Sequence, residues 1–305
     1  MILSPVLAHT FGMRWMVALL LVGGCGATGA RTVGGESMAA RGSGNELLLP
    51  PELGEAARLR AVIGRQPVIG VIEEGPTPVV IRGKVDRREA RRLVALARAI
   101  HADVNARFVA PREGKHPPVD LVLYRDDEEY QALALGYARV PAGQGFYRPD
   151  ARVAAVNLSR GRGNLRHELV HPLIVDDFPG IPTWLNEGIA SMYGGAHRVR
   201  GRFVFVANYR LRDLHDAIDD GLLPRRDEVA FAGRPELYGP DGAIYYAVAQ
   251  HVVLYLERRG RLGAYYRTVR TNPGLRGAAL AAEVDWRRFV RWARRLRDGY
   301  RPPLP

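Results

Sequence analysis

The five residues His167-Glu168-Leu169-Val170-His171 constrain this chain more than any other segment. In a helix, side chains four residues apart project from the same face, one turn above each other. Two imidazoles placed in this way can share one metal ion at about 2 Å each. Glu168 then lies beside the first histidine, where it can reach a water molecule without being a ligand. The motif predicts a helical metal site, although helices with two solvated histidines also occur.

A catalytic zinc ion usually has three protein ligands, and the histidines supply two. The segment 184–190, Trp-Leu-Asn-Glu-Gly-Ile-Ala, places Glu187 on the next helix, which is expected to begin at Pro182 and end at Gly194-Gly195. An antiparallel return of that helix would bring Glu187 to the metal. Taken alone, Glu187 would be interpreted as a surface carboxylate. With the two histidines upstream, we predict it as the third ligand.

Pro172 directly follows His171 and complicates the motif. Proline disfavours the α conformation at the preceding residue and cannot donate a hydrogen bond to the carbonyl of Glu168. We therefore expect the helix to end or kink here, with His171 in its last turn. Asp176 and Asp177 are interpreted as turn residues, with the alternative that one of them orients a ligand histidine.

Together, the histidine motif and the segment 184–190 resemble the gluzincin group of zinc metallopeptidases, and within it the bacterial peptidase-MA-like proteins. The resemblance covers roughly residues 119–260 and is specific over about 30 of them. It implies a zincin-like catalytic domain, a small mixed sheet plus an active-site helix. It further implies that His167, His171 and Glu187 bind Zn²⁺ and that Glu168 is the general base.

The same resemblance implies two further features of the site. A tyrosine on a downstream helix often hydrogen-bonds the developing oxyanion, and Tyr246 fits this pattern; its neighbour Tyr245, or packing alone, are the alternatives. An edge strand before the motif holds the substrate backbone, which would fall on residues 151–158. His251 follows on the same helix as Tyr246 and is interpreted as a core or surface histidine.

Apolar periodicity and turn residues predict the remaining elements. Strands are expected at 68–72 and 78–81 (a hairpin), 119–124, 151–158 and 203–206, the last after a turn at Arg200-Gly201. Helices are expected at 87–108 after Asp86, from Asp126, at 165–171 after Asn164, from Pro182, and from Ala243 onward. This order predicts an α+β fold, with a mixed α/β half followed by a mainly helical part and no internal repeat.

The net charge of +12 does not by itself indicate a nucleic-acid partner. Of the 44 basic residues only Lys84 and Lys115 are lysines, a bias that reflects composition more than a selected basic surface. The arginine clusters at 87–92 and 287–295 lie on the polar sides of expected amphipathic helices, without interleaved aromatic residues or a binding motif. We therefore predict no nucleic-acid binding.

The N-terminal segment resembles an export signal. Arg14 precedes a short apolar stretch at 15–22, and Gly23-Gly24 precedes Cys25, the only cysteine, so that no intrachain disulfide can form. This order resembles the lipobox of a bacterial lipoprotein, which implies a signal peptide over 1–24 and lipidation of Cys25. A misassigned start with a buried free cysteine is the alternative. The polar composition of residues 25–51 predicts a flexible linker.

Residues 52–118 are then expected to form an N-terminal α/β region and residues 119–305 the zincin-like domain with its helical C-terminal part. On the resemblance, the expected function is a zinc-dependent peptide hydrolase. It would be exported to the bacterial cell envelope, attached to the membrane through Cys25 only, and would act on a peptide or protein substrate. One alternative is a different metal-assisted amide hydrolysis, such as cell-wall peptide cleavage. The other is a non-catalytic lipoprotein that keeps the zincin scaffold for binding or envelope structure.

Overall fold

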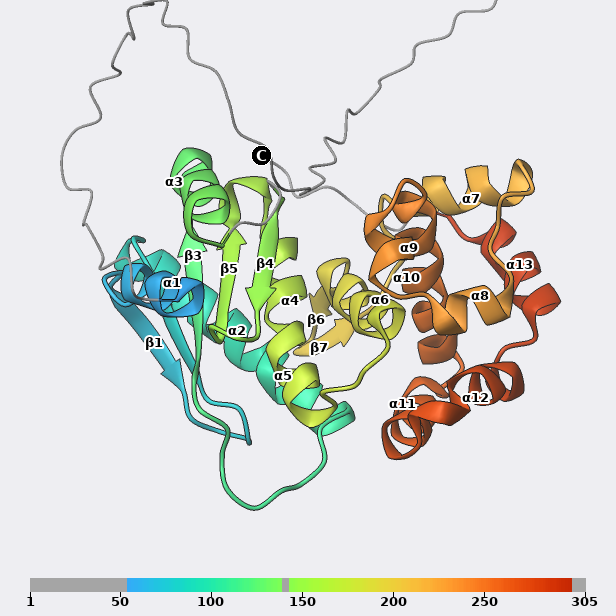
Figure 1. Cartoon of the computed structure of the whole chain (residues 1–305), viewed down its shortest axis with the longest axis horizontal. Helices are drawn as coiled ribbons and strands as arrows, with labels where there is room; N and C mark the ends of the chain where they lie inside the picture. Colours follow the sequence, from blue (N-terminus) through green and yellow to red (C-terminus); the bar gives the residue numbers. More distant parts are fainter. Residues whose placement is uncertain (1–53, 139–142, 298–305) are drawn as a thin grey trace, which may run out of the picture. The chain divides into compact units, whose positions relative to one another are not determined.

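The computed structural model describes residues 54–138 and 143–297, which belong to one compact unit. Within these ranges a five-stranded mixed sheet with its helices precedes a mainly helical C-terminal part, so the expected α+β fold class is confirmed (Figure 1). The strands of the sheet are β1 (Val68–Ile72), β2 (Val79–Gly83), β3 (Val119–Tyr124), β4 (Gly145–Arg148) and β5 (Val153–Asn157). The helices of this first half are α1 (Glu55–Ile63), α2 (Arg87–Arg107) and α3 (Asp127–Leu133), the last continued by a π-helical turn at Ala134–Ala138.

The strand order of the sheet is β1-β2-β3-β5-β4, with three parallel central strands and antiparallel partners at both edges. Every residue of β5 is buried. Such a continuous buried run belongs to a strand covered on both faces. The expectation that residues 151–158 form an edge strand is therefore wrong, because β4 pairs with β5 and takes the edge position itself.

Helices cover both faces of the sheet. Successive residues of β3 point to opposite faces because a strand has a period of two. Leu121 and Leu123 join the larger apolar core together with α2, whereas Val122 joins a smaller core with residues of α1 and α3. The sheet is thus a buried platform on which the following helices are placed.

Helix α2 shows how local sequence fixes an element of this platform. The Asp86 carboxylate accepts a hydrogen bond from the backbone N–H of Glu89 at 2.9 Å, which satisfies an otherwise unpaired donor of the first turn. The buried side chains recur at helical spacing as Leu93, Ala97, Ile100, His101 and Val104. The predicted helix at 87–108 is confirmed.

The histidine motif lies on two consecutive helices, α4 (Gly163–Glu168) and α5 (Val170–Asp177). The interruption falls at Leu169, because Pro172 has no N–H to donate to the Glu168 carbonyl. Pro172 itself is the third residue of α5, and in the first turn of a helix the missing N–H leaves no bond unmade. The expected kink is present, but the helix continues to Asp177 and His171 lies in a first turn, not a last one.

The predicted cap of this helix is wrong. Arg162 occupies the N-cap position of α4, and Asn164 lies inside the helix. The Asn164 side-chain amide instead donates a hydrogen bond to the carbonyl of Asn157 at the end of β5, at 3.1 Å. Asn164 therefore ties α4 to the sheet.

Helix α6 (Thr183–Gly194) begins directly after Pro182, as expected, and packs against the long helix α10 (Gly242–Arg258). Between them the chain forms a small hairpin, β6 (His197–Val199) and β7 (Arg202–Val204), whose turn residues Arg200 and Gly201 have φ of 48° and 83°. Two positive φ values define the turn type that matches strand twist, so the predicted turn is confirmed.

The helical C-terminal part is confirmed as well. Its other helices are α7 (Leu211–Asp219), α8 (Arg226–Phe231), α9 (Arg234–Tyr238), α11 (Leu262–Thr271), α12 (Arg276–Glu283) and α13 (Trp286–Arg295). Three of them, α7 to α9, precede Ala243, where the helical part was expected to begin. No helix in the described ranges is both long and apolar enough to cross a membrane.

The expected division at residue 118 does not separate two folded units. β2 lies before this point and β3 after it, yet the two strands pair along their whole length, from Val79↔Val119 to Gly83↔Leu123. The predictions for the signal peptide at 1–24, for Cys25 and for the linker at 25–51 lie outside the described residues.

Candidate metal centre

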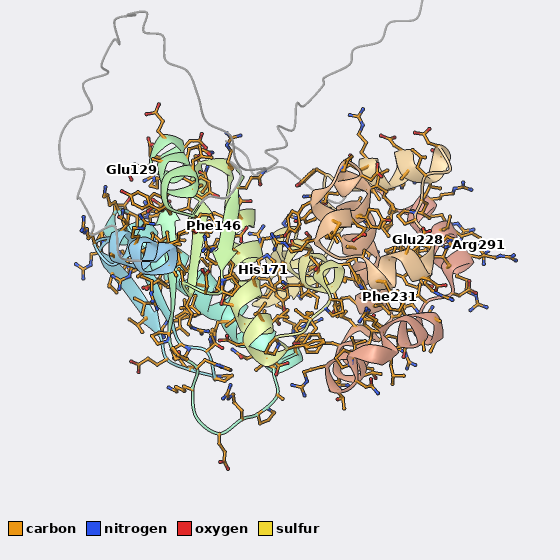
Figure 2. All side chains as sticks on the ribbon, viewed as in Figure 1. Glu129, Phe146, His171, Glu228, Phe231 and Arg291 are labelled. Carbon is orange, nitrogen blue, oxygen red and sulfur yellow. The ribbon has the colours of Figure 1, made fainter. Side chains whose placement is uncertain are left out.

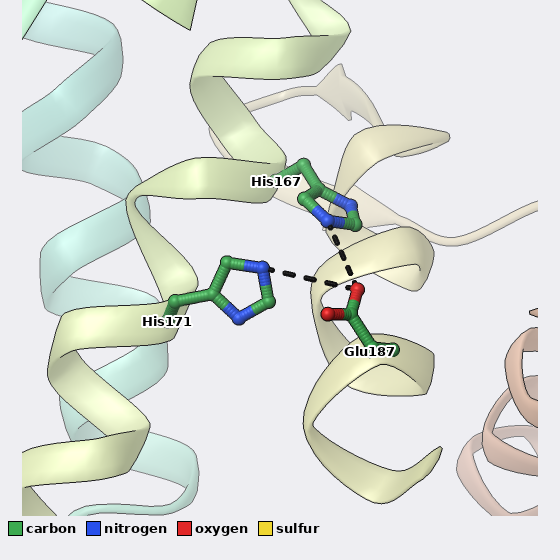
Figure 3. Close-up of side chains that lie close together, drawn as sticks. All are labelled: His167, His171 and Glu187. Atoms are coloured by element: carbon green, nitrogen blue, oxygen red, sulfur yellow. Dashed lines mark ion pairs between the residues drawn. The ribbon is translucent and has the colours of Figure 1, made fainter. Parts of the chain in front are cut away.

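Three side chains from three helices converge on one point: His167 of α4, His171 of α5 and Glu187 of α6 (Figure 3). Glu187 Oε2 lies 3.4 Å from His167 Nε2 and 3.9 Å from His171 Nε2. The ligand atoms of all three residues lie within 4.8 Å of one another. Tetrahedral ligands about 2.0–2.2 Å from a zinc ion are separated from each other by roughly 3.3–3.6 Å. The triad that the sequence predicts is therefore brought together at a spacing that one metal ion fits after small side-chain rotations.

The triad is largely withdrawn from solvent. His171 lies in the interior (Figure 2), with 7% of its surface exposed, and Glu187 has 6% exposed. The side chain of His167 is 22% exposed and lines a cavity of about 890 Å³. A metal ion held here would be buried on the side of α5 and α6 and reachable through the cavity beside His167.

Asn186 fixes the orientation of one imidazole. His171 Nδ1 donates a hydrogen bond to Asn186 Oδ1 at 3.0 Å, which turns Nε2 toward Glu187. Asn186 lies on α6 next to Glu187, and the sequence analysis gave it no role.

The aspartates considered for this orienting role have other partners. Asp176 pairs with Arg152 at 2.8 Å and accepts a hydrogen bond from the Thr77 hydroxyl at 2.7 Å. Asp177 pairs with Arg270 at 2.6 Å. Both therefore join α5 to neighbouring segments of the fold and do not contact the triad.

Glu187 is held from the side opposite the histidines by a tyrosine of α9. The Tyr238 hydroxyl donates a hydrogen bond to Glu187 Oε1 at 2.7 Å, while Oε2 faces the two imidazoles. Burial alone would raise the pKa of Glu187, but His171 and His167 outweigh burial and lower this pKa to about 2. The carboxylate is therefore ionised and oriented, as a metal ligand must be.

Glu168 lies beside the triad without belonging to it. Its carboxyl Oε2 is 4.0 Å from His171 Nε2, and 7% of the residue is exposed. Burial raises the pKa of Glu168, against the opposing effect of the two histidines. Gly145, at the start of the edge strand β4, runs so close that a Cβ there would overlap the Glu168 side chain. A buried carboxyl with a raised pKa at a cavity wall has the properties of a general base.

Tyr246 lines the same cavity as His167 and Glu168. Its ring meets that of Tyr238 edge-on at 6.0 Å, and the Arg210 guanidinium carbon lies 4.5 Å from its ring centroid. Burial raises the pKa of Tyr246, so its hydroxyl remains a donor at neutral pH. This placement leaves the predicted hydrogen-bonding role open to Tyr246.

Two other residues of the same helix, Tyr245 and His251, do not line the cavity. Tyr245 packs against the main apolar core. His251 is fully buried, and its Nδ1 donates to the Ala247 carbonyl at 2.7 Å. His251 was interpreted as a core or surface histidine, and its burial fits the first of these.

No protein-family model matches the chain, and no curated protein matches it either. The likeness to gluzincins therefore rests on the motif residues and on the arrangement of their side chains. Three residues of this arrangement, Asn186, Tyr238 and Arg210, were not identified from the sequence. Only Asn186 carried a local signal, because it directly precedes Glu187.

Proposed function

We propose that the chain is a zinc-dependent peptide hydrolase of the gluzincin type. The observation that carries this proposal is the convergence of His167, His171 and Glu187 beside the buried carboxyl of Glu168 at the wall of one cavity. A pair of solvated histidines would have neither a buried carboxylate between them nor a second buried carboxyl beside that carboxylate. The proposal also means that the domain has a zincin-like fold.

The donor set supports zinc as the metal. Two imidazole nitrogens and one carboxylate oxygen are a common catalytic zinc site, which keeps a further position free for chemistry. Glu187 is ionised, and the hydrogen bond to Asn186 orients the His171 ring with Nε2 toward Glu187, so both side chains are placed to bind a cation. Zinc, when bound, supplies a Lewis acid that polarises the peptide carbonyl and makes water more acidic.

Two residues beside the triad, Glu168 and Tyr246, would carry out the proton transfer and the stabilisation of negative charge. Glu168 accepts a proton from the attacking water and passes it to the nitrogen of the leaving amine. Tyr246 donates a hydrogen bond to the carbonyl oxygen as negative charge develops there. Both side chains line the cavity in which the peptide would lie.

The edge strand β4 is the element suited to hold the substrate backbone. Gly143, Gln144 and Gly145 line the cavity at the start of this strand, next to Glu168. Within residues 54–138 and 143–297, β5 is the only strand that pairs with β4, so the other edge of β4 is the one that an extended peptide would join. Such strand addition provides affinity through backbone hydrogen bonds and makes little demand on sequence.

We also propose that the protein is exported and anchored to the bacterial cell envelope through lipidated Cys25, where it acts on peptides or proteins. The lipobox-like order of residues before Cys25 supports this location. Membrane fractionation tests it: Cys25→Ser is expected to move the protein from the membrane to the soluble fraction, and an unchanged distribution would exclude lipidation at this residue.

The decisive experiment compares zinc content and peptide hydrolysis in three proteins. Glu168→Gln is expected to retain one zinc ion and to lower the hydrolysis rate by about 10²–10⁴-fold, because the proton acceptor is lost while the ligands remain. Glu113→Gln is the matched control, since this exposed glutamate lies outside the cavity.

Two outcomes would contradict the proposal. Equal hydrolysis by wild type and Glu168→Gln would remove Glu168 from the mechanism, and unchanged zinc content in Glu187→Ala would remove Glu187 from the metal site. Stoichiometric zinc without cleavage of any peptide in a library would favour the non-catalytic scaffold instead.

A further inference from the structure

The cavity beside the triad is lined by side chains of mostly positive charge. Its charged residues, other than the histidines, are four arginines and one carboxylate: Arg160, Arg162, Arg166, Arg210 and Glu168. Glu168 is the only Asp or Glu on the described wall, so the arginines outnumber the carboxylates there by four to one. An anionic ligand is therefore favoured there over a cationic one.

Two of the four arginines already have partners in the fold. Arg160 pairs with Asp127 at 3.3 Å. Arg166 donates hydrogen bonds to the carbonyls of Tyr193 and Gly194 at 3.0 and 2.8 Å. Their charges contribute to the field of the cavity, but their donors are engaged.

Arg210 differs from Arg160 and Arg166 because its guanidinium contacts aromatic rings. Its guanidinium carbon lies 4.5 Å from the ring centroid of Tyr246 and 5.2 Å from that of Tyr209. Its backbone N–H donates to Asn208 Oδ1 at 2.9 Å, which fixes the start of α7. Cation–π contacts of this kind do not by themselves use up the guanidinium N–H groups, which can still donate to an acceptor.

The guanidinium N–H groups of Arg210 have no hydrogen-bond acceptor within the described ranges. No side-chain hydrogen bond and no ion pair within 4.0 Å joins Arg210 to any residue of 54–138 or 143–297. A half-buried guanidinium that is positioned by two rings but left without an acceptor matches the planar, two-oxygen geometry of a carboxylate. Arg210 also contacts Tyr246, the residue assigned to the peptide carbonyl, so the carboxylate would lie close to the bond that is cut.

We propose that Arg210 is a specificity residue that binds a carboxylate of the substrate beside the metal triad, so that the enzyme prefers peptides that present a carboxylate at this position. This inference rests on the proposed peptide hydrolase function. Two sources supply the same chemistry: the side chain of an Asp or Glu next to the cleaved bond, or the C-terminal carboxylate of a peptide. Arg162, exposed at the cavity wall, adds attraction for either source.

The test uses four fluorescein-labelled peptides of one sequence, with Glu or Gln at one internal position and a free or amidated C-terminus. Their affinities are measured by fluorescence anisotropy on the zinc-loaded Glu168→Gln chain, which binds without cutting. Adding Arg210→Ala is expected to weaken binding of peptides that carry the recognised carboxylate by about 10- to 100-fold, because a hydrogen-bonded charge pair is lost. Peptides without it should change little.

Two further variants control this experiment. Arg212→Ala removes an arginine of the same segment whose side chain is 87% exposed and pairs with Asp216, and it is expected to leave all four affinities unchanged. Arg210→Lys keeps the charge but not the planar fork and is expected to restore part of the affinity.

The outcomes separate this inference from the proposed function. Equal weakening of all four peptides by Arg210→Ala, or no weakening, would overturn carboxylate recognition even if the Glu168-containing enzyme cleaves peptides. If Arg210→Ala weakens only the peptides with the carboxylate, but the protein with Glu168 intact cleaves none of the four, carboxylate recognition is supported and peptide hydrolysis is contradicted.

Discussion

At the scale of single residues, the metal triad depends on neighbours that are not ligands. His171 presents Nε2 to Glu187 because its Nδ1 is bound to Asn186, and Glu187 presents Oε2 to the histidines because its Oε1 is bound to Tyr238. Such partners restrict the rotation of the ligands before the metal arrives. Their loss should therefore weaken metal binding without abolishing it.

Asn186→Ala is expected to lower zinc affinity by about 10- to 100-fold, since the His171 ring loses the acceptor that orients it. Competition with a chromophoric chelator measures this change. Asn105→Ala is the matched control, because the Asn105 amide contacts the ring of His101 in α2 at 3.0 Å, outside the cavity. Equal zinc affinity in the two variants would show that the Asn186 contact does not orient His171.

Tyr246→Phe is expected to lower kcat by about 10²-fold with zinc content unchanged, because only the hydrogen bond to the developing negative charge is removed. Steady-state kinetics on one peptide substrate measures the effect. Tyr245→Phe is the neighbouring control and should retain nearly full activity, since Tyr245 does not line the cavity. A larger loss in Tyr245→Phe than in Tyr246→Phe would reverse the assignment.

The sequence predicted the residues that are close together along the chain. His167, His171 and Glu187 lie within a short segment; the spacing of the histidines follows from helix geometry, and Glu187 lies on the next helix along the chain. Tyr238 contacts Glu187 across 51 residues, and Arg210 contacts Tyr246 from a different helix, so neither pairing leaves a local pattern. Only the assembled fold identifies them.

At the scale of elements, Asp86 and the Arg200-Gly201 turn predicted boundaries correctly, whereas the cap at Asn164 and the edge position of residues 151–158 were wrong. Asp86 fixed the start of α2, and Arg200-Gly201 fixed a hairpin, because each acts through its own backbone. Whether β5 lies at the edge of the sheet depends on whether another strand, here β4, pairs with it, and a strand's own sequence does not determine this. A signal was nonetheless present: the uninterrupted apolar run from Val153 to Val156 is typical of an interior strand.

The contact of α6 with α10 depends on Gly188. A Cβ at this position would lie 2.7 Å from the Ala249 carbonyl oxygen, a backbone atom that cannot turn aside. Gly188→Ala is therefore expected to push the helices apart and to lower the free energy of unfolding by about 1–3 kcal/mol. Because α6 also carries Glu187, zinc affinity should fall with it.

Thermal unfolding and zinc titration measure both effects. Gly136→Ala is the control, since a Cβ there meets no atom within 4 Å. If Gly188→Ala is as stable as this control and keeps full zinc affinity, the close contact of α6 with α10 at Gly188 contributes neither to stability nor to metal binding.

At the scale of the whole molecule, the cavity joins the two halves of the chain. Gly145 and Glu168 come from the sheet and the helix on it, whereas Tyr246 and Arg210 come from the helical C-terminal part. The described ranges form one unit, so the site is complete only when both halves are folded. The ionisation of Glu187, at the centre of this arrangement, is consequently linked to folding itself.

This linkage predicts how pH affects the metal-free protein. In the folded chain the pKa of Glu187 is about 2, below the ordinary value of 4.5, because the two histidines outweigh burial. A lowered carboxyl pKa stabilises the folded state above the unfolded value, and this contribution is lost as pH falls from about 4.5 toward about 2. The full contribution is up to about 3 kcal/mol.

Urea unfolding of metal-free wild type and Glu187→Gln at a series of pH values measures this contribution. From about pH 5 downward, the advantage of wild type in unfolding free energy should shrink steadily toward about pH 2, because both proteins then carry a neutral group at this position. Glu113→Gln, at an exposed site, should differ from wild type by nearly the same small amount throughout. An advantage of wild type over Glu187→Gln that stays constant down to about pH 3 would mean that the histidines do not hold Glu187 ionised in the folded chain.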